Sequence, residues 1–552
     1  MKKTALFLTA LWMAALIPAA GAQHLSEALE THITRMMSYE QIPGLALAVH
    51  EADGSVWFQN FGQMGLDDER PVTEHSLFEI GSVTKTFTGS LFLLLMEAHG
   101  FDGETSVNSL LEGSGLQLPD QESAPITLNH LMTHTSGLPR LPGNMTPADD
   151  RDPYKDYSTE QLKAYAAAVQ PQRAPGEDWE YSNFTFMVLG FLAAYLENRD
   201  FDQLIREHLT EPLGMTRTLR EVPEALQPDV AGGSMFGAYA PAWHFDELRG
   251  LGELRSTSAD LIRYLEAHLG TDSFARSAAL QAGHQPRYSL SDELHMGFSW
   301  FIRDLNENAG RLIYHGGGTG GFRSAIAFDP ASGRAAVALT NSNSDVQDLA
   351  LHLANPAAPL RELPEDGALP EALIAQLSGL YQNPNLPVFE LFGQNGRLMG
   401  QMDGQPALPL EQVEGLSFRN QAVGARMEFE ASGQEPATGF VLHQGGMQFP
   451  FERITERPTG PVAIALSPEV LAEYAGTYHA GGGLSFQIEA AEGHLSARLT
   501  GQPAAKVLPE GNDRFFYEVV PAALQFERND EGRITAVTLL QHGQEIRFQR
   551  EP

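Results

Sequence analysis

Apolar and polar positions near the start of the chain follow first a helical and then a strand period. Over residues 25–37 apolar side chains recur on one helical face, which predicts an amphipathic helix. Residues 42–49 are apolar and contain a Pro-Gly turn at their start, a pattern that predicts a buried strand. Residues 55–62 are typical of the strand that pairs with it in a hairpin. A longer apolar run predicts a buried helix over residues 86–98 that begins near Gly81.

Helical and strand-like patterns continue along the chain. We expect helices over residues 159–169, 184–196, 201–209 and 259–269. Strand-like runs over residues 311–314, 323–328 and 335–341 then follow in hairpin order around a glycine-rich turn. This order predicts that the first and last strands of the region pair. Helices, strands, a helical middle and strands again therefore indicate an α+β fold with a mixed sheet.

The C-terminal third contains a duplication. Prolines recur over residues 356–370, which is typical of a linker. Gly379 and Tyr381 are then matched by Gly476 and Tyr478, 97 residues later. Both copies consist of short alternating runs separated by glycine-containing turns, a pattern that favours small antiparallel barrels. We expect two lipocalin-like β-barrel domains, over residues 371–457 and 466–552.

The first 22 residues have the order of a secretory signal peptide. Two lysines, an apolar stretch over residues 5–18 and three small residues precede Gln23. A membrane anchor is the alternative, but the apolar run is shorter than the roughly 20 residues that a membrane span needs. We expect cleavage after Ala22, no stable membrane insertion, and a periplasmic or secreted protein.

Composition excludes several partners. The 552 residues include 70 acidic and 36 basic side chains, for a formal charge of −34, and no cysteine. Such a surface repels nucleic acid and anionic lipid, so we expect neither as a partner. Without cysteine, no function of the chain depends on a disulfide or a thiol.

A serine and a lysine stand three residues apart at the start of the predicted buried helix. In a helical turn Ser82 and Lys85 share a face. Free N–H groups at a helix start also favour the anion that forms when a serine attacks a carbonyl. Most Ser-x-x-Lys tetrapeptides are surface residues without a role. After the leader, however, the chain has only four lysines, at positions 85, 155, 163 and 506, so a lysine in this apolar setting favours a catalytic pair.

Two further stretches carry the groups that such a pair needs. Tyr181 and Asn183 present a phenol and an amide to one side if the backbone is extended. A phenol beside a lysine ammonium can ionise well below its usual pKa of about 10 and take the serine proton, although an isolated tyrosine here would more often pack on Trp179. The glycines that follow His315 leave N–H groups free to face an oxyanion. His315 could donate to the tyrosine or to the substrate, or it could face solvent in a flexible hairpin.

His130 and His134 have the spacing of a metal-binding pair. No HExxH sequence surrounds them, so we interpret them as structural histidines. The chain also has neither a G-x-S-x-G elbow nor a phosphate-binding loop. We expect no metal and no cofactor.

The three motifs, in this order and at these separations, resemble those of the penicillin-recognising serine hydrolases. The likeness is nearest to class C β-lactamases, of the peptidase family S12 type, and to their esterase and D-aminopeptidase relatives. It covers about residues 25–343, and the two C-terminal domains resemble the barrels appended to D-aminopeptidases of this family. The motifs are Ser82-Val83-Thr84-Lys85, Tyr181-Ser182-Asn183 and His315-Gly316-Gly317.

This resemblance implies a β-lactamase-like fold over residues 23–355, with an antiparallel sheet, helices on both of its faces and an all-helical region. It also implies an acyl-enzyme mechanism. Ser82 would be the nucleophile, and Lys85 and Tyr181 would share the general-base work, with the choice between them left open. Asn183 would hold the substrate amide, and the backbone N–H groups of Ser82 and Gly318 would form the oxyanion hole. Gly317 and Thr319 are further expected substrate-binding residues.

One motif departs from the family pattern. His315 stands where many relatives carry the lysine of Lys-Thr-Gly, which helps to hold a substrate carboxylate. The resemblance therefore favours esters, amides or D-amino-acid peptides over β-lactams, and it implies that His315 belongs to the catalytic group.

We thus expect a secreted serine hydrolase that acts through an acyl-enzyme on small esters, amides or D-amino-acid-containing peptides. A β-lactamase or a D-alanyl-D-alanine carboxypeptidase is the alternative with the same chemistry. A non-catalytic sensor or binding protein on a hydrolase scaffold is the alternative of another class. The expected partner is a small-molecule or peptide substrate, and the C-terminal domains could join subunits into a homo-oligomer.

Overall fold

The computed structural model describes residues 25–551 with several gaps, so the expected signal peptide lies outside the described residues. The gaps are 120–124, 236, 306–308, 364–368, 385, 395, 404, 406, 421–422, 432, 434, 458–462, 481–483, 492, 501–503, 512, 518–521, 530 and 542–543.

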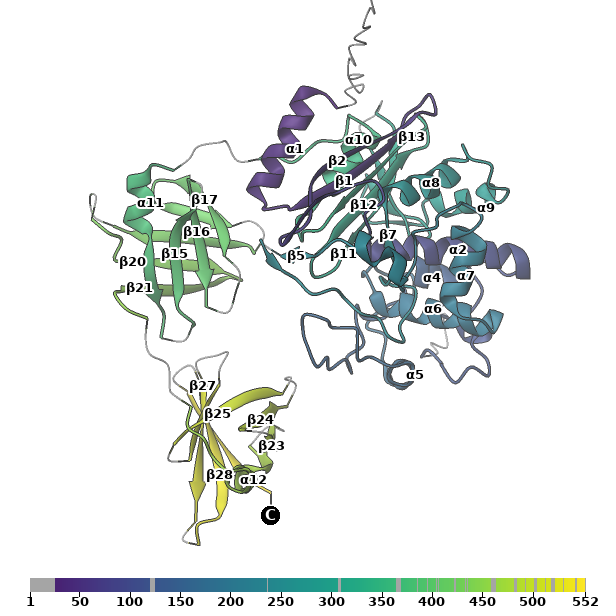
Figure 1. Ribbon diagram of the computed structural model, residues 1–552. Coiled ribbons are helices and arrows are strands. Elements are labelled where there is room, and N and C mark those ends of the chain that lie inside the picture. Colours follow the sequence, from purple (N-terminus) through teal and green to yellow (C-terminus); the bar gives the residue numbers. More distant parts are fainter. Residues whose placement is uncertain are drawn as a thin grey trace, which may run out of the picture.

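A nine-stranded antiparallel sheet forms the centre of the N-terminal region (Figure 1), in the order β3-β2-β1-β13-β12-β11-β10-β9-β8. Strand β1 pairs with β13, and Leu45 lies opposite Thr340. The expected pairing of the two ends of this region is therefore confirmed. The strands are β1 (Gly44–His50), β2 (Val56–Gly65), β3 (Asp68–Pro71), β8 (Tyr288–Ser289), β9 (Leu294–Met296), β10 (Phe301–Asp304), β11 (Arg311–Gly318), β12 (Arg323–Asp329) and β13 (Arg334–Thr340).

Helices cover both faces of this sheet because its central strands are apolar on both sides. Along β1, Leu45, Leu47 and Val49 pack with α1 (Glu27–Tyr39) and α10 (Gln347–Ala354). The residues between them, Ala46 and Ala48, belong to the core on the other face, with α2 (Thr84–His99) and α8 (Ser258–Leu269). This alternation is the two-residue period of a strand.

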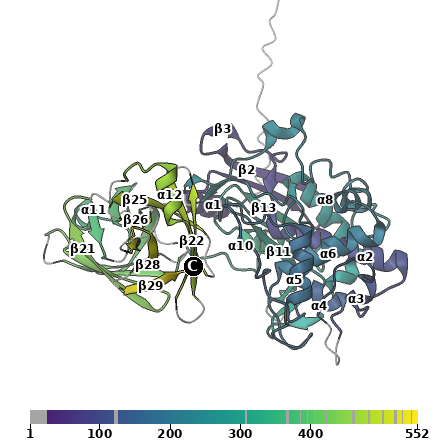
Figure 2. The same cartoon turned by 90° about the horizontal axis from the view of Figure 1, so that it is seen from below.

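The remaining helices form a layer beyond α2, and α2 and α6 lie side by side (Figure 2). Two expectations need correction. The helix expected over residues 201–209 ends at Ile205 and continues as a π-helical turn, Arg206–Thr210, and the strand expected over residues 311–314 runs on through the glycines to Gly318. The other helices of this region are α3 (Val107–Leu110), α4 (Leu128–Met132), α5 (Thr159–Ala168), α6 (Asn183–Glu197), α7 (Phe201–Ile205) and α9 (Ser277–Gln281), and short strands pair as β4 (Phe78–Glu79) with β7 (Arg255–Ser256) and β5 (Ser234–Met235) with β6 (Ala238–Tyr239).

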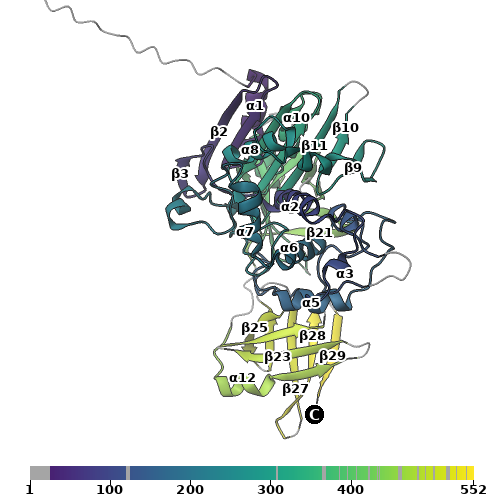
Figure 3. The same ribbon diagram turned by 90° about the vertical axis from the view of Figure 1, so that its right-hand side faces the viewer.

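Two closed eight-stranded barrels follow, as expected from the duplication. In each, consecutive strands pair and the last strand pairs with the first, so neither barrel leaves an open edge. A short helix precedes each barrel, and Figure 3 shows α12 beside the second one, in yellow. The elements are α11 (Glu371–Leu377), β14 (Gly379–Gln382), β15 (Phe389–Gln394), β16 (Arg397–Met402), β17 (Leu408–Glu414), β18 (Ser417–Asn420), β19 (Ala425–Glu430), β20 (Gly439–Gln444), β21 (Met447–Ile454), α12 (Pro468–Tyr474), β22 (Gly476–His479), β23 (Ser485–Ala491), β24 (His494–Leu499), β25 (Ala505–Gly511), β26 (Arg514–Tyr517), β27 (Ala522–Arg528), β28 (Ile534–Gln541) and β29 (Gln544–Arg550).

The repeated tyrosines join each barrel to its helix. The hydroxyls of Tyr381 and Tyr478 each donate to the carbonyl of the residue four positions earlier, at 2.7 Å. An arginine of the last strand faces each ring, Arg453 at 5.5 Å and Arg550 at 5.7 Å. The two copies thus use the same contacts to close.

In the described part of the chain, no helix combines the length and apolarity needed to cross a bilayer.

Candidate active site

Ser82 lies in a tight turn between a short strand and the buried helix α2. The turn is a 3₁₀ helix, Gly81–Val83, and α2 continues it from Thr84. Just before the turn, the N–H of Ile80 donates to the carbonyl of Leu254 at 3.0 Å, next to the β4–β7 pair. Backbone pairing on the N-terminal side and a buried helix on the other therefore hold Ser82 in place.

Glycines bring this turn against strand β11. Gly81 has a φ of +48°, and a Cβ there would lie 2.6 Å from the nitrogen of Gly318. A Cβ on Gly317 would lie 2.0 Å from the carbonyl oxygen of Ile80, which accepts a 2.7 Å hydrogen bond from the Ser324 hydroxyl. The absence of side chains thus lets the backbone of β11 lie directly beside Ser82.

Lys85 is fully buried beneath the serine. Its Nζ lies 3.1 Å from Ser82 Oγ and donates to the carbonyl of Leu251 at 2.6 Å. Burial lowers the pKa of Lys85 to about 7, although the Glu253 carboxylate opposes the shift; the positive charge of Arg140 lowers the pKa further. Near neutral pH this amine is therefore partly uncharged and can accept a proton.

Glu253 shapes the loop that contacts Lys85. Its carboxylate accepts the backbone N–H groups of Gly250, Leu251 and Gly252, at 2.6, 3.1 and 2.9 Å. These bonds orient the Leu251 carbonyl toward the lysine. No sequence signal pointed to Glu253, because its contacts are to main-chain groups that leave no motif.

The Tyr181 phenol contacts the same serine, but it does not ionise easily. Burial raises its pKa well above the usual value, and a hydrogen bond with Ser82 and the charge of Arg140 only partly oppose this. The expectation of a phenol ionising below its usual pKa is therefore wrong. The tyrosine also packs on Trp179, with ring centroids 6.4 Å apart. Packing on Trp179 and contact with Ser82 therefore occur together.

His315 is buried on β11 and neutral. Its Nδ1 lies 2.6 Å from the carbonyl of Gly316 and must donate to it, since a carbonyl only accepts. Burial lowers the pKa of His315 to about 3, and the charge of Lys85 adds to this. Nε2 is thus an unprotonated acceptor, and no described residue pairs with it. The expectation that His315 donates to tyrosine or substrate is corrected: its free nitrogen accepts, and it is not solvent-facing.

Asn183 begins helix α6, two residues after Tyr181. Its Nδ2 donates to the Tyr154 hydroxyl at 2.8 Å, while its Oδ1 has no partner among the described residues. A buried acceptor of this kind can take an N–H from a ligand. Thr319 follows Gly318 and donates its N–H to the carbonyl of Phe322 at 3.1 Å, so it forms part of the turn between β11 and β12.

The two spaced histidines have separate structural contacts. His130 takes part in the capping box of α4 with Thr127. His134 accepts the N–H of Ser182 at 3.1 Å, and its ring lies 4.3 Å from that of Tyr181. Within the described ranges, no group of three histidine or acidic side chains could hold a metal ion.

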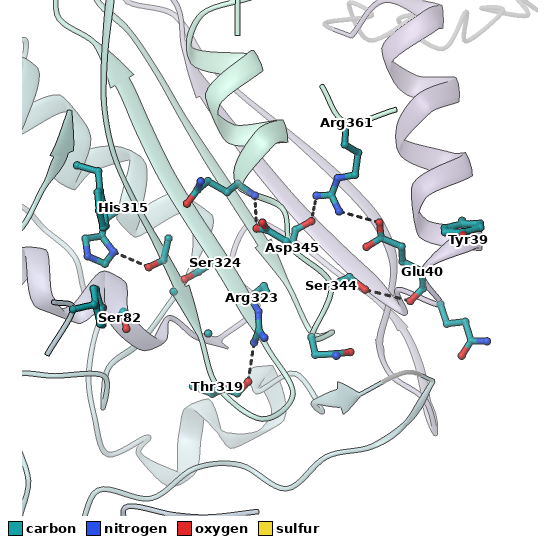
Figure 4. A pocket seen from close by; sticks show the side chains of 18 of the residues that line it. Tyr39, Glu40, Ser82, His315, Thr319, Arg323, Ser324, Ser344, Asp345 and Arg361 are labelled. Atoms are coloured by element: carbon teal, nitrogen blue, oxygen red, sulfur yellow. Dashed lines mark hydrogen bonds and ion pairs between the residues drawn. The ribbon is translucent and has the colours of Figure 1, made fainter. Parts of the chain in front are cut away.

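A cavity of about 1120 Å³ is lined by Ser82, Tyr181 and His315. Figure 4 shows Ser82 and His315 at one end and Tyr39, Glu40 and Arg361 at the other. The cavity wall also includes Pro409, Glu411 and Asn420 of the first barrel. The sequence offered no signal for these linker and barrel residues, because only the tertiary structure places them near Ser82.

The cavity is therefore lined by six residues that the sequence singled out, Ser82, Tyr181, His315, Gly317, Gly318 and Thr319. Lys85 contacts Ser82 from beneath. A serine bonded to a buried lysine, next to a tyrosine and a glycine-lined strand, defines a serine hydrolase. The chain belongs to the β-lactamase family: the family model described as "Beta-lactamase" matches residues 29–358, more than half of the chain.

Comparisons with known proteins agree with this family. A "Beta-lactamase" of Yersinia enterocolitica is 31% identical over 49% of this chain and 66% of its own length, so the chain spans just under two thirds of that relative. "Penicillin-binding protein 4*" of Bacillus subtilis is 25% identical over 76% of this chain and 97% of its own length. A solved class C β-lactamase is 26% identical, has a TM-score of 0.52, and covers 61% of this chain and 96% of that structure. Residues 461–550, in the second barrel, match a domain of unknown function, DUF3471.

Proposed function

We propose that this protein is an exported hydrolase that transfers the acyl group of small esters, amides or D-amino-acid peptides to Ser82 and then to water. The observation that supports this most is the 3.1 Å contact between Ser82 Oγ and the buried Nζ of Lys85. A lysine whose pKa is about 7 has both charge states available at neutral pH.

In the acylation step, neutral Lys85 takes the proton of Ser82 as Oγ bonds to the substrate carbonyl. The carbonyl electron pair moves to its oxygen, where the N–H groups of Ser82 and Gly318 receive the negative charge. Collapse of this intermediate expels the leaving group, which takes the proton that Lys85 received from Ser82, either directly or through the Tyr181 hydroxyl as a relay, so that Lys85 and Tyr181 are both neutral again. The raised pKa of Tyr181 keeps its phenol protonated, so the phenol does not serve as the base for Ser82. Water then repeats the sequence on the acyl-enzyme.

The substrate is selected by the free acceptors and by an aromatic wall. Asn183 Oδ1 and His315 Nε2 accept hydrogen bonds from N–H or O–H groups. The rings of Trp179 and Phe301, with centroids 6.2 Å apart, line the cavity beside them. A small acyl group with an amide or amino N–H and an apolar part suits these groups.

A β-lactamase or a D-alanyl-D-alanine carboxypeptidase is the second candidate, and the names of the relatives favour it. The neutral acceptor at His315 disfavours it, because an unprotonated nitrogen repels the carboxylate that a lysine would attract. Gly317 and Thr319 would still bind the substrate backbone in either case.

Kinetics with three substrates separate the candidates. We expect hydrolysis of phenyl acetate and of D-alanine p-nitroanilide, slow or absent hydrolysis of nitrocefin, and loss of all activity in Ser82→Ala. Intact mass after mixing with substrate should show a transient adduct at Ser82. Efficient nitrocefin hydrolysis without turnover of the other two would favour the second candidate instead.

Export and assembly are separate parts of the proposal. The leader at residues 1–22 supports secretion or a periplasmic location, and N-terminal sequencing of the mature protein tests it: a first residue of Gln23 is expected, and an intact Met1 would contradict it. Assembly through the barrels is tested by light scattering of the full chain, for which a monomer mass would exclude a homo-oligomer.

A further inference from the structure

Arg140 lies at the rim of the cavity, next to the residues that face the acyl group. Its backbone carbonyl accepts the N–H groups of Asn183 and Phe184, at 2.9 and 3.2 Å. Its guanidinium carbon lies 5.1 Å from the centre of the Tyr181 ring. The main chain of Arg140 is thus tied to the start of α6, and its exposed side chain lines the cavity above the tyrosine.

The other two arginines of the cavity wall are already bound. Arg361 forms ion pairs with Glu40 and Asp348. Arg323 donates to the carbonyls of Thr319 and Phe322, at 2.9 and 3.0 Å. Among the described residues, the Arg140 guanidinium has no carboxylate or carbonyl partner, so its hydrogen-bond donors remain available to a ligand.

The opposite wall cannot supply this positive charge. His315 is neutral, and its Nε2, which has no partner among the described residues, can only accept a hydrogen bond. His315 on strand β11 therefore cannot attract an anion. The planar guanidinium of Arg140, whose main chain is bonded to Asn183, has the geometry that suits a carboxylate.

We propose that Arg140 is the residue that selects substrates with a carboxylate on the acyl portion. This inference rests on the proposed function, in which Asn183 holds the acyl-side amide, because the two residues share backbone hydrogen bonds. The selected substrates are acyl donors with an amide or amino group near the scissile carbonyl and a carboxylate farther along the chain. Since the protein carries a charge of −34, such anions need a local cation to bind, and salt should weaken their binding.

A binding measurement tests Arg140 independently of catalysis. The Ser82→Ala protein and the Ser82→Ala, Arg140→Gln double variant are titrated with glutaramate and with the uncharged diamide glutaramide, using the fluorescence of Trp179 and Trp243 in the cavity wall. We expect the affinity for glutaramate to fall about tenfold in the double variant, as for a lost charge-assisted hydrogen bond, and that for glutaramide to fall much less. Equal or undetectable glutaramate binding in both proteins would overturn the proposal.

Kinetics in the active protein test the position of the anion. Two p-nitrophenyl esters are compared: the ester of adipate, which keeps a free carboxylate, and the ester of monomethyl adipate, which has none. The ratio of kcat/KM for the first ester to kcat/KM for the second should fall about tenfold in Arg140→Gln and recover in part in Arg140→Lys. Arg151→Gln is the matched control, since Arg151 is exposed and pairs with Asp149 farther along the same connection.

A second ester pair places the charge on the leaving group, as 4-acetoxybenzoate and its methyl ester. If Arg140→Gln changes this ratio and not the adipate ratio, the anion belongs to the leaving group and the proposal is wrong. If no ester acylates Ser82, the proposed function fails, while the titration still decides the role of Arg140.

Discussion

At the scale of single residues, burial separates the two groups that could act as the base. Lys85 and Tyr181 both contact Ser82; the lysine is fully buried and the tyrosine is half-buried, and burial disfavours the charged form of each group. It therefore lowers the pKa of the lysine to about 7 and raises that of the tyrosine. Both groups are then neutral, which supports the proposal that the amine of Lys85, and not the phenol, accepts the Ser82 proton.

This assignment predicts the pH dependence of acylation. The amine of Lys85 is uncharged above its pKa, so kcat/KM for a neutral ester should rise about tenfold per pH unit at low pH and level off above about pH 7. Stopped-flow kinetics with phenyl acetate measure this limb. A midpoint near 10, or a flat profile down to pH 5, would contradict the assignment.

The buried carboxylate of Glu253 leads to a second prediction. Because its charge raises the pKa of Lys85, Glu253→Gln should move the midpoint of the same limb to lower pH. One amide oxygen also replaces a carboxylate that accepts three N–H groups, so the free energy of unfolding should fall by about 1–3 kcal/mol. Glu221→Gln, at an exposed position, is the control, and an upward shift of the midpoint would refute the charge effect.

At the scale of elements, the site depends on how closely α2 and β11 approach each other. The 3₁₀ turn carries Ser82, and the strand supplies His315 and the glycines that follow it. Nothing but glycine separates their backbones at positions 81 and 317. The geometry of the site is thus set by main-chain contact rather than by side-chain packing.

Gly317→Ala should therefore disrupt the site. A Cβ at 2.0 Å from the Ile80 oxygen forces the strand and the turn apart, and a displacement of about 1 Å costs roughly a hundredfold in rate. Gly65→Ala on β2 is a matched control, because its Cβ would meet no atom closer than 3.6 Å. Hydrolysis rates and thermal melts of both variants, measured together, separate lost activity from lost folding. Comparable activity in the two variants would disprove the close-contact argument.

At the scale of the whole molecule, the first barrel completes the cavity. Arg397 donates to the carbonyl of Tyr39 at 3.1 Å and covers its ring at 4.4 Å, and the Tyr39 hydroxyl donates to the Glu411 carboxylate. These contacts hold barrel residues in the wall of the cavity that contains Ser82. The expected limits of the domains, at residues 355, 371, 457 and 466, stay predictions.

Weakening this contact should change the size selectivity. Arg397→Ala removes the cation–π contact and one hydrogen bond, so bulky acyl esters should gain severalfold in kcat/KM relative to acetate esters. Arg426→Ala is the control, because Arg426 lies in the same barrel but pairs with Glu428 rather than with Tyr39. Matching selectivity in the two variants would show that the barrel does not limit the substrate.

The local sequence was enough to predict the fold class, the duplication and the order of the catalytic motifs. Each of these depends on periodicity, on turn residues or on the spacing of neighbours, as for Ser82 and Lys85 on one helical turn. The barrels could likewise be predicted, because the same glycine and tyrosine recur with the same strand pattern.

Only the tertiary structure decided how these groups are charged and what surrounds them. The pKa values of Lys85 and His315 depend on burial by segments far away in the chain. The contact between Lys85 and the Leu251 carbonyl and the barrel wall of the cavity likewise arise from contacts over long sequence distances. Local patterns specify which residues carry the chemistry, whereas desolvation and contact between distant segments determine the form in which they act.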